Sequence, residues 1–248
     1  MCLAAAQNLG WNLVNRADNC NVQSDQRCCG GSDSLDAQQS FARTTHYRFV
    51  ANERDLYEAL DTQDYRYVVT LRHSRERYLS HFRHMDRVTP SYKDPFSTWW
   101  TGQPDNWNVR RICGTRCSNV PKFQLSAQLF DYTLDRLDQF EDLLFVEDYS
   151  ESYRRFAQRV GWAHASIRNE NHQAPILKSQ NFHTLLDDWD PLMSALDDAL
   201  YEYARAKYEG GQQQQPPRPT HQISTYFAQG PGRNCSTLCC TVPCSPYR

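Results

Sequence analysis

The stretch "YVVTLRHSRERYLSHFRHM", residues 67–85, passes from a short apolar segment into one crowded with Arg and His. The run "YVVTL" is continuous and largely β-branched, which is typical of a strand covered on both faces, as in a parallel sheet. From Ser74 onward, Tyr78, Phe82 and Met85 recur at helical spacing, and Ser74 is suited to the N-cap. A central strand, a tight turn and a helix are therefore predicted here.

A second buried strand is predicted at "LLFVE", residues 143–147. Helices are predicted on either side of it, at residues 123–138 and 150–162. A last helix follows the cap Asp190-Pro191 and ends before Gly210. This alternation predicts an α/β domain with a central, mostly parallel sheet flanked by helices.

Two regions lack a clear periodicity. Residues 89–121 are rich in Pro, Gly and Trp and are expected to form a long irregular insertion with short helical pieces. Residues 210–248 read as a low-complexity linker and a Cys-rich tail, mostly poorly ordered. The remaining residues, 1–209, are then one domain, which fits a chain of 248 residues.

Composition restricts the partners and the compartment. A net charge of −2 argues against general affinity for nucleic acid or acidic membranes, so any anion site must be local. No run of about 18 apolar residues is present, and the opening "MCLAAAQNLGWNLV" lacks the basic start of a signal peptide. Ten cysteines favour disulfides in an oxidising compartment, with zinc as the competing interpretation. The sequon at Asn234 adds little.

Positive charge gathers where the first predicted strand ends. Arg72 follows the strand directly, and Ser80 lies eight residues later in the helix. Ligands of parallel sheets bind beyond the carboxyl ends of the strands, and Arg, a helix start and a hydroxyl together suit a phosphate. Arg75, Arg77 and Arg83 are explained equally well as a solvated helix face.

The segment "VVTLRHSRERYLSHFRH" resembles the 3′-phosphate-binding segment of sulfotransferases that use 3′-phosphoadenosine 5′-phosphosulfate (PAPS), especially Golgi carbohydrate enzymes of the heparan-sulfate 2-O and 6-O type. "DNWNVRRICG", "LLFVEDYSESYRRFAQRVGW" and "LDDALYEYARAKYE" are similar to later segments of that family, in the same order. The resemblance implies a P-loop-like three-layer domain, PAPS as the donor, no metal, and a place in the Golgi lumen.

The resemblance also assigns roles to residues. Arg72 and Ser80 would bind the 3′-phosphate, Arg77 falls at the family's second Arg, and His46 falls at the place of the catalytic base, although a lone His is more often a surface residue. The family's amino-terminal loop for the 5′-phosphosulfate has no counterpart, since the first lysine is Lys93. The sequence is therefore expected to be truncated at its start, with a membrane anchor upstream.

An aromatic and polar set suits a sugar or an anionic glycan, and ordinary core packing or a solvated loop explains its members as well. Its members are Trp107, Asn108, Arg110, Arg111 and Arg168. The leading hypothesis is a sulfotransferase that acts on a hydroxyl of a carbohydrate acceptor. The alternatives are a non-catalytic, truncated nucleotide-binding relative and a secreted disulfide-stabilised binding protein.

Overall fold

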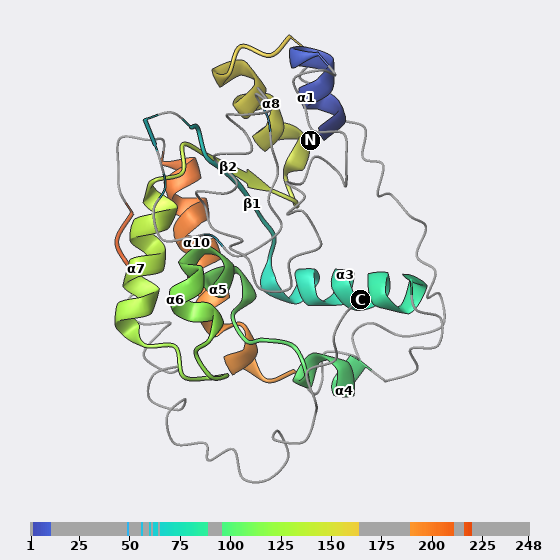
Figure 1. Ribbon diagram of the computed structural model, residues 1–248, viewed down its shortest axis with the longest axis vertical. Coiled ribbons are helices and arrows are strands. Elements are labelled where there is room, and N and C mark those ends of the chain that lie inside the picture. The colour runs from blue at the N-terminus through green and yellow to red at the C-terminus, as the bar shows by residue number, and fades with distance from the viewer. Residues whose placement is uncertain are drawn as a thin grey trace, which may run out of the picture.

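A computed structural model describes residues 2–10, 49, 56, 60, 62–63, 65–88, 96–163, 189–210 and 216–219 of the chain. Its helices and strands follow one another as shown in Figure 1. In chain order they are α1 (Cys2–Leu9), β1 (Val68–Leu71), α3 (Ser74–Val88), α4 (Phe96–Thr101), α5 (Trp107–Cys113), α6 (Thr115–Ser118), α7 (Ala127–Asp138), β2 (Asp142–Phe145), α8 (Tyr149–Arg159), the 3-10 helix η3 (Pro191–Met193) and α10 (Ala195–Glu209).

The two strands pair in parallel. Val68 lies opposite Asp142, and Leu71 lies opposite Phe145. Parallel neighbours need a crossover connection, and here α3 to α7 provide it. The described part is thus a mixed structure of helices around a small two-stranded parallel sheet, which is compatible with the predicted α/β class.

Helices pack on both faces of this sheet. Every residue of β2 is buried. Leu143 and Phe145 join the core formed with α5, α7 and α10, whereas Leu144 packs against Tyr153 and Phe156 of α8 on the other face. Strand β1 is less protected, since Thr70 is exposed. The prediction of a strand covered on both faces is therefore confirmed for β2 and wrong for β1.

A second, aromatic core holds α3 against α4. Tyr78 and Phe82 of α3 meet Phe96 and Trp99 of α4, and the ring centres of Phe82 and Phe96 are 5.3 Å apart. The hydroxyl of Tyr78 donates to the carbonyl oxygen of Pro104 at 2.6 Å. The apolar spacing in residues 74–85 thus marks the buried face of a helix, as predicted.

The junction between α5 and α6 is closely packed. Gly114 has φ +74°, and a Cβ atom there would meet the carbonyl oxygen of Leu56 at 1.6 Å, so no other residue fits without moving the backbone. Cys113 and Cys117 on either side of it are joined by a disulfide, with Cα atoms 5.6 Å apart. For this pair the disulfide interpretation replaces zinc; the side chains of the other cysteines lie outside the described residues.

Removing this disulfide is expected to destabilise the fold. The cross-link closes a loop of five residues, and the chain-entropy relation gives about 2 kcal/mol for a loop of that size. The variant C113A/C117A should therefore lose about 2 kcal/mol in the free energy of unfolding, measured by urea titration. If the wild-type protein loses a similar free energy of unfolding under reducing conditions, the effect comes from the disulfide bond. An unchanged urea midpoint for C113A/C117A would contradict the prediction.

Part of the predicted tail lies on the domain. Arg218 pairs with Asp131 at 3.4 Å and also with Asp135, both on α7. Arg218 thus attaches residues 216–219 to that helix by charge, whereas the rest of residues 211–248 lies outside the described part, so the order of the tail stays a prediction. Among the described helices, none is long and apolar enough to cross a membrane.

Candidate functional site

Arg72 stands at the carboxyl end of β1, as predicted. Its side chain is partly exposed, and its Nη2 lies 3.8 Å from the Oε2 of Glu76, in the first turn of α3. Ser80 is half-buried and lies a further turn along the same side of the helix, because residues four apart are stacked neighbours. Glu76 thus links Arg72 to the side of α3 that carries Ser80, and their joint binding of a phosphate stays a prediction.

Ser74 has a different role from the predicted N-cap. It is completely buried, and its hydroxyl donates to Asp198 on α10. The hydroxyl of Ser194 donates to the other oxygen of Asp198 at 2.9 Å. This carboxylate therefore ties the start of α3 to the start of α10.

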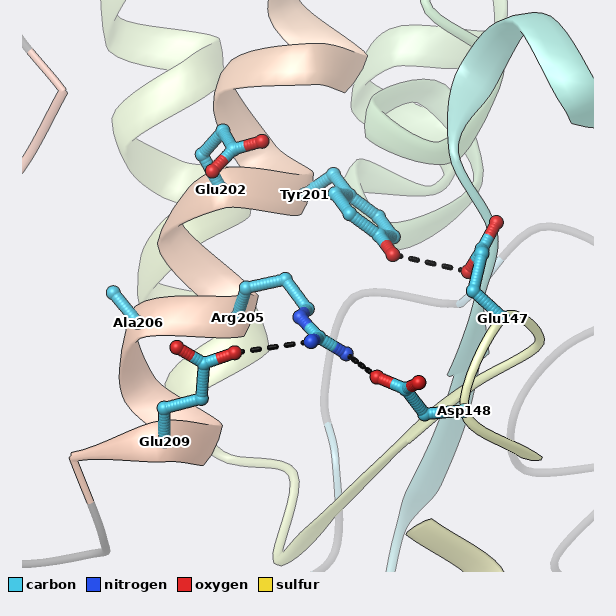
Figure 2. A pocket seen from close by; sticks show the side chains of 7 residues that line it. All are labelled: Glu147, Asp148, Tyr201, Glu202, Arg205, Ala206 and Glu209. Atoms are coloured by element: carbon cyan, nitrogen blue, oxygen red, sulfur yellow. Dashed lines mark hydrogen bonds and ion pairs between the residues drawn. The ribbon is translucent and has the colours of Figure 1, made fainter. Parts of the chain in front are cut away.

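The ends of the two strands also border a hollow of about 440 Å³, shown in Figure 2. The backbone N–H of His73 donates to Glu147 at 2.9 Å, and the hydroxyl of Tyr201 donates to the other carboxylate oxygen at 3.0 Å. Arg205 is held between Asp148 and Glu209. The lining residues are Glu147, Asp148, Tyr201, Glu202, Arg205, Ala206 and Glu209.

This hollow carries the wrong charge for a phosphate. Its lining has four carboxylates and a single guanidinium, and that guanidinium is already paired with two of the carboxylates. Like charges repel an anion at short range. The lining of this hollow therefore does not suit an anionic ligand.

Arg77 of α3 contacts Trp107 of α5. Its guanidinium stacks on the indole of Trp107, with the central carbon 4.1 Å from the ring centre. Its Nε and Nη2 are buried without a hydrogen-bond partner. Burial lowers the pKa of Arg77, and the charge of Arg111 lowers it further, while Tyr78 and Asp197 act in the opposite direction. That Arg77 binds the 3′-phosphate therefore stays a prediction.

The indole of Trp107 contacts several basic side chains. Arg111 also stacks on its indole, at 4.7 Å from the ring centre. The ring of His81 meets it edge-on at 5.8 Å, and burial, followed by the charges of Arg77 and His84, lowers the pKa of His81. The structure thus groups Trp107 and Arg111, two of the predicted acceptor residues, with Arg77.

Asn108 contributes its backbone. Its N–H and that of Val109 donate to the two carboxylate oxygens of Asp197, at 3.0 and 2.8 Å. In return, the side-chain oxygen of Asn106 accepts the N–H groups of Leu196 and Asp197 at 2.8 and 3.2 Å. The two helix starts of α5 and α10 therefore cap each other, which satisfies N–H groups that would otherwise lack partners.

Arg110 has a structural role, contrary to the prediction that it binds substrate. Only 6% of it is exposed. Its Nε and Nη2 donate to Asp105, and its Nη1 and Nη2 donate to the carbonyl oxygens of Cys117, Val120 and Pro121. Since all five N–H donors are engaged inside the protein, none is left for an acceptor sugar.

Asp197 is expected to make stability depend on pH. Burial raises its pKa from 3.8 to about 7, against the opposing effect of the two backbone N–H donors. A carboxyl group with a raised pKa in the folded state stabilises the fold below its unfolded pKa, and this contribution is lost as the pH rises through the folded value. The wild type should therefore lose stability between about pH 4 and pH 7 relative to Asp197→Asn, which cannot titrate.

Urea unfolding of both proteins at pH 4 and pH 7.5 measures this difference. The substitution places an amide donor against backbone donors, so the variant is less stable throughout, and only the change with pH bears on the prediction. Parallel pH profiles for the two proteins would show that Asp197 keeps one protonation state over that range.

Two predicted residues, His46 and Arg168, lie outside the described residues. Sequence reasoning missed the buried Asp105, Asn106 and Asp197, because the first two lie in the predicted irregular insertion and the third lies inside the predicted last helix, where no local pattern marks them. In the part of the chain that the structure describes, no group of three or more His, Cys, Asp or Glu side chains is arranged to hold a metal. Comparisons with protein-family models, curated proteins and solved structures found no match.

Proposed function

We propose that this chain is a PAPS-dependent sulfotransferase of the Golgi lumen that acts on a hydroxyl of a carbohydrate. The observation that supports the proposal best is the position of Arg72 at the carboxyl end of a parallel strand, directly ahead of α3. Ligands of parallel sheets bind at such strand ends. The P-loop-like three-layer fold of the resembling family belongs to the same proposal.

The chemistry assigns each group a task. The guanidinium of Arg72 offers planar donors to the 3′-phosphate, and the Ser80 hydroxyl adds one more. His46 takes the proton of the acceptor hydroxyl. At the same time, the hydroxyl oxygen bonds to sulfur, and the bond between sulfur and the 5′-phosphate oxygen breaks. Trp107, Asn108 and Arg111 would contact the acceptor, with Arg77 stacked on the indole of Trp107.

A second candidate is a protein that binds the nucleotide without transferring its sulfuryl group. The observation that favours it is that the segments resembling the family include the 3′-phosphate segment but not the loop for the 5′-phosphosulfate. The first lysine of this sequence, Lys93, follows the 3′-phosphate segment. Such a chain would hold adenosine 3′,5′-bisphosphate through the Arg72 side of α3.

Incubation of the purified chain with PAPS and a panel of glycans separates the two candidates. Sulfate transfer to a glycan supports the enzyme. A rise in melting temperature with adenosine 3′,5′-bisphosphate in the absence of transfer supports the binding protein. If circular dichroism shows a folded chain, the absence of both sulfate transfer and a rise in melting temperature with the bisphosphate would rule out both candidates.

A further inference from the structure

Arg77 is the most unusual charged group in the described part of the chain. Its Nε and Nη2 are buried without a hydrogen-bond partner, whereas the buried Arg110 uses every donor it has. Leaving a buried charged donor unsatisfied is more costly than leaving a neutral one, so such groups point to a missing acceptor. The donors of Arg77 are matched to an oxyanion, because a guanidinium presents its N–H groups in a planar fork.

The surroundings add positive potential at the same place. Arg111 stacks on the same indole as Arg77, and its charge lowers the pKa of Arg77, so both guanidinium groups contribute positive potential around Trp107. An oxyanion at Arg77 supplies the missing acceptor atoms and is attracted by both guanidinium charges, whereas a neutral ligand gains only the hydrogen bonds and a cation is repelled.

Asp197 does not fill this role. Its two oxygens accept the N–H groups of Asn108 and Val109, and its charge attracts Arg77 without giving a hydrogen bond to the buried Nε and Nη2. Both carboxylate oxygens of Asp197 therefore cap the start of α5. The acceptor that Arg77 lacks has to come from outside the described residues.

We propose that Arg77, Trp107 and Arg111 form a binding site for an oxyanion, the carboxylate or sulfate group of a ligand, separate from the Arg72 end of β1. Arg77 donates to the oxyanion from Nε and Nη2, and Arg111 adds charge. The indole of Trp107 packs against the body of the ligand. The site would exist in this chain whether or not Arg72 binds a nucleotide.

Ligand entry has a structural consequence. Because Nε and Nη2 of Arg77 are not exposed, an oxyanion reaches them only after the side chains that cover them shift. Trp107 is half-buried and stacked on this guanidinium, so its indole changes surroundings when the site fills. Tryptophan fluorescence should report binding, and Trp107→Phe should lose that signal while the other tryptophans remain.

The test titrates sodium sulfate and, separately, sodium glucuronate into the purified chain, with sodium chloride added to hold the ionic strength constant. Melting temperature and fluorescence are recorded for the wild type, Arg77→Met, Arg77→Lys, Arg111→Met and Arg72→Met. The wild type should show saturable binding of at least one anion. Arg77→Met should weaken it at least tenfold, since charge-assisted hydrogen bonds are lost, and Arg77→Lys should fall between the two.

The variants also separate this site from the nucleotide site. Arg72→Met should bind the simple anion as the wild type does, whatever its effect on adenosine 3′,5′-bisphosphate. Sulfate binding that responds while glucuronate does not would identify a tetrahedral group as the ligand, and the reverse would identify a carboxylate. Equal binding by Arg77→Met and wild type, a loss confined to Arg72→Met, or no response beyond that of chloride would each overturn the proposal.

Discussion

Replacing Arg110 by Met is expected to lower the free energy of unfolding by about 3–5 kcal/mol, the typical result of removing one partner of a buried ion pair. Asp105 is completely buried and would be left without its counter-charge. Three backbone carbonyl oxygens, those of Cys117, Val120 and Pro121, would lose their donor at the same time. Met retains much of the aliphatic volume, so the loss reports charge and hydrogen bonds. Urea unfolding followed by circular dichroism measures it.

Two controls bracket this effect. Arg66 pairs with Glu141 at 2.7 Å where both side chains are more than 40% exposed, so Arg66→Met should cost less than about 1 kcal/mol. Adding Asp105→Asn to Arg110→Met removes the stranded charge and should recover part of the loss. If Arg110→Met is no more harmful than Arg66→Met, the guanidinium is not the organising centre of this loop.

Local sequence was sufficient for the elements that surround the candidate site. The β-branched run before Arg72 and the four-and-three spacing of Tyr78, Phe82 and Met85 predicted β1 and α3, because both patterns act between neighbours in the chain. Asp190 caps the next turn, as predicted, by accepting the N–H of Leu192 at 2.9 Å. The predicted last helix is nevertheless split at Ser194, where η3 ends and α10 begins.

The polar network behind the site could not be predicted from local sequence. Asn106 and Leu196 are 90 positions apart in the sequence, and no spacing rule connects residues at such a separation. Asn106 also adopts φ 46°, a left-handed conformation that Asn tolerates better than most residues. Its residue type is compatible with that role and does not specify it.

Arg110 and Arg111 show where residue type alone misleads. The two are adjacent and identical, and consecutive helix positions point in directions about 100° apart. Val109, Ile112 and Cys113 mark the buried face of α5, and Arg110 lies beside that face, where it is enclosed. Arg111 stacks on Trp107 and stays half-buried. A helical projection of "WNVRRIC" would have separated the two arginines once the helix was recognised.

Replacing Arg72 by Ala is expected to weaken binding of adenosine 3′,5′-bisphosphate by about ten- to a hundredfold. A hydrogen bond to a charged group contributes roughly 1.5–3 kcal/mol. In the proposed function, the partly exposed guanidinium of Arg72 donates such hydrogen bonds to the 3′-phosphate. Ser80→Ala should weaken binding less, since it removes one neutral donor. Isothermal titration calorimetry of the three proteins at one ionic strength gives the affinities.

The neighbours of Arg72 supply matched controls of opposite sign. Glu76 lies 3.8 Å from the Arg72 guanidinium and competes with an incoming phosphate, so Glu76→Gln should bind the bisphosphate as tightly as the wild type or more tightly. Arg75 is exposed on the same helix, and Arg75→Ala changes the net charge as Arg72→Ala does. An equal loss in Arg75→Ala and Arg72→Ala would mean that α3 attracts the nucleotide by its overall charge, because a specific contact at the strand end affects Arg72 alone.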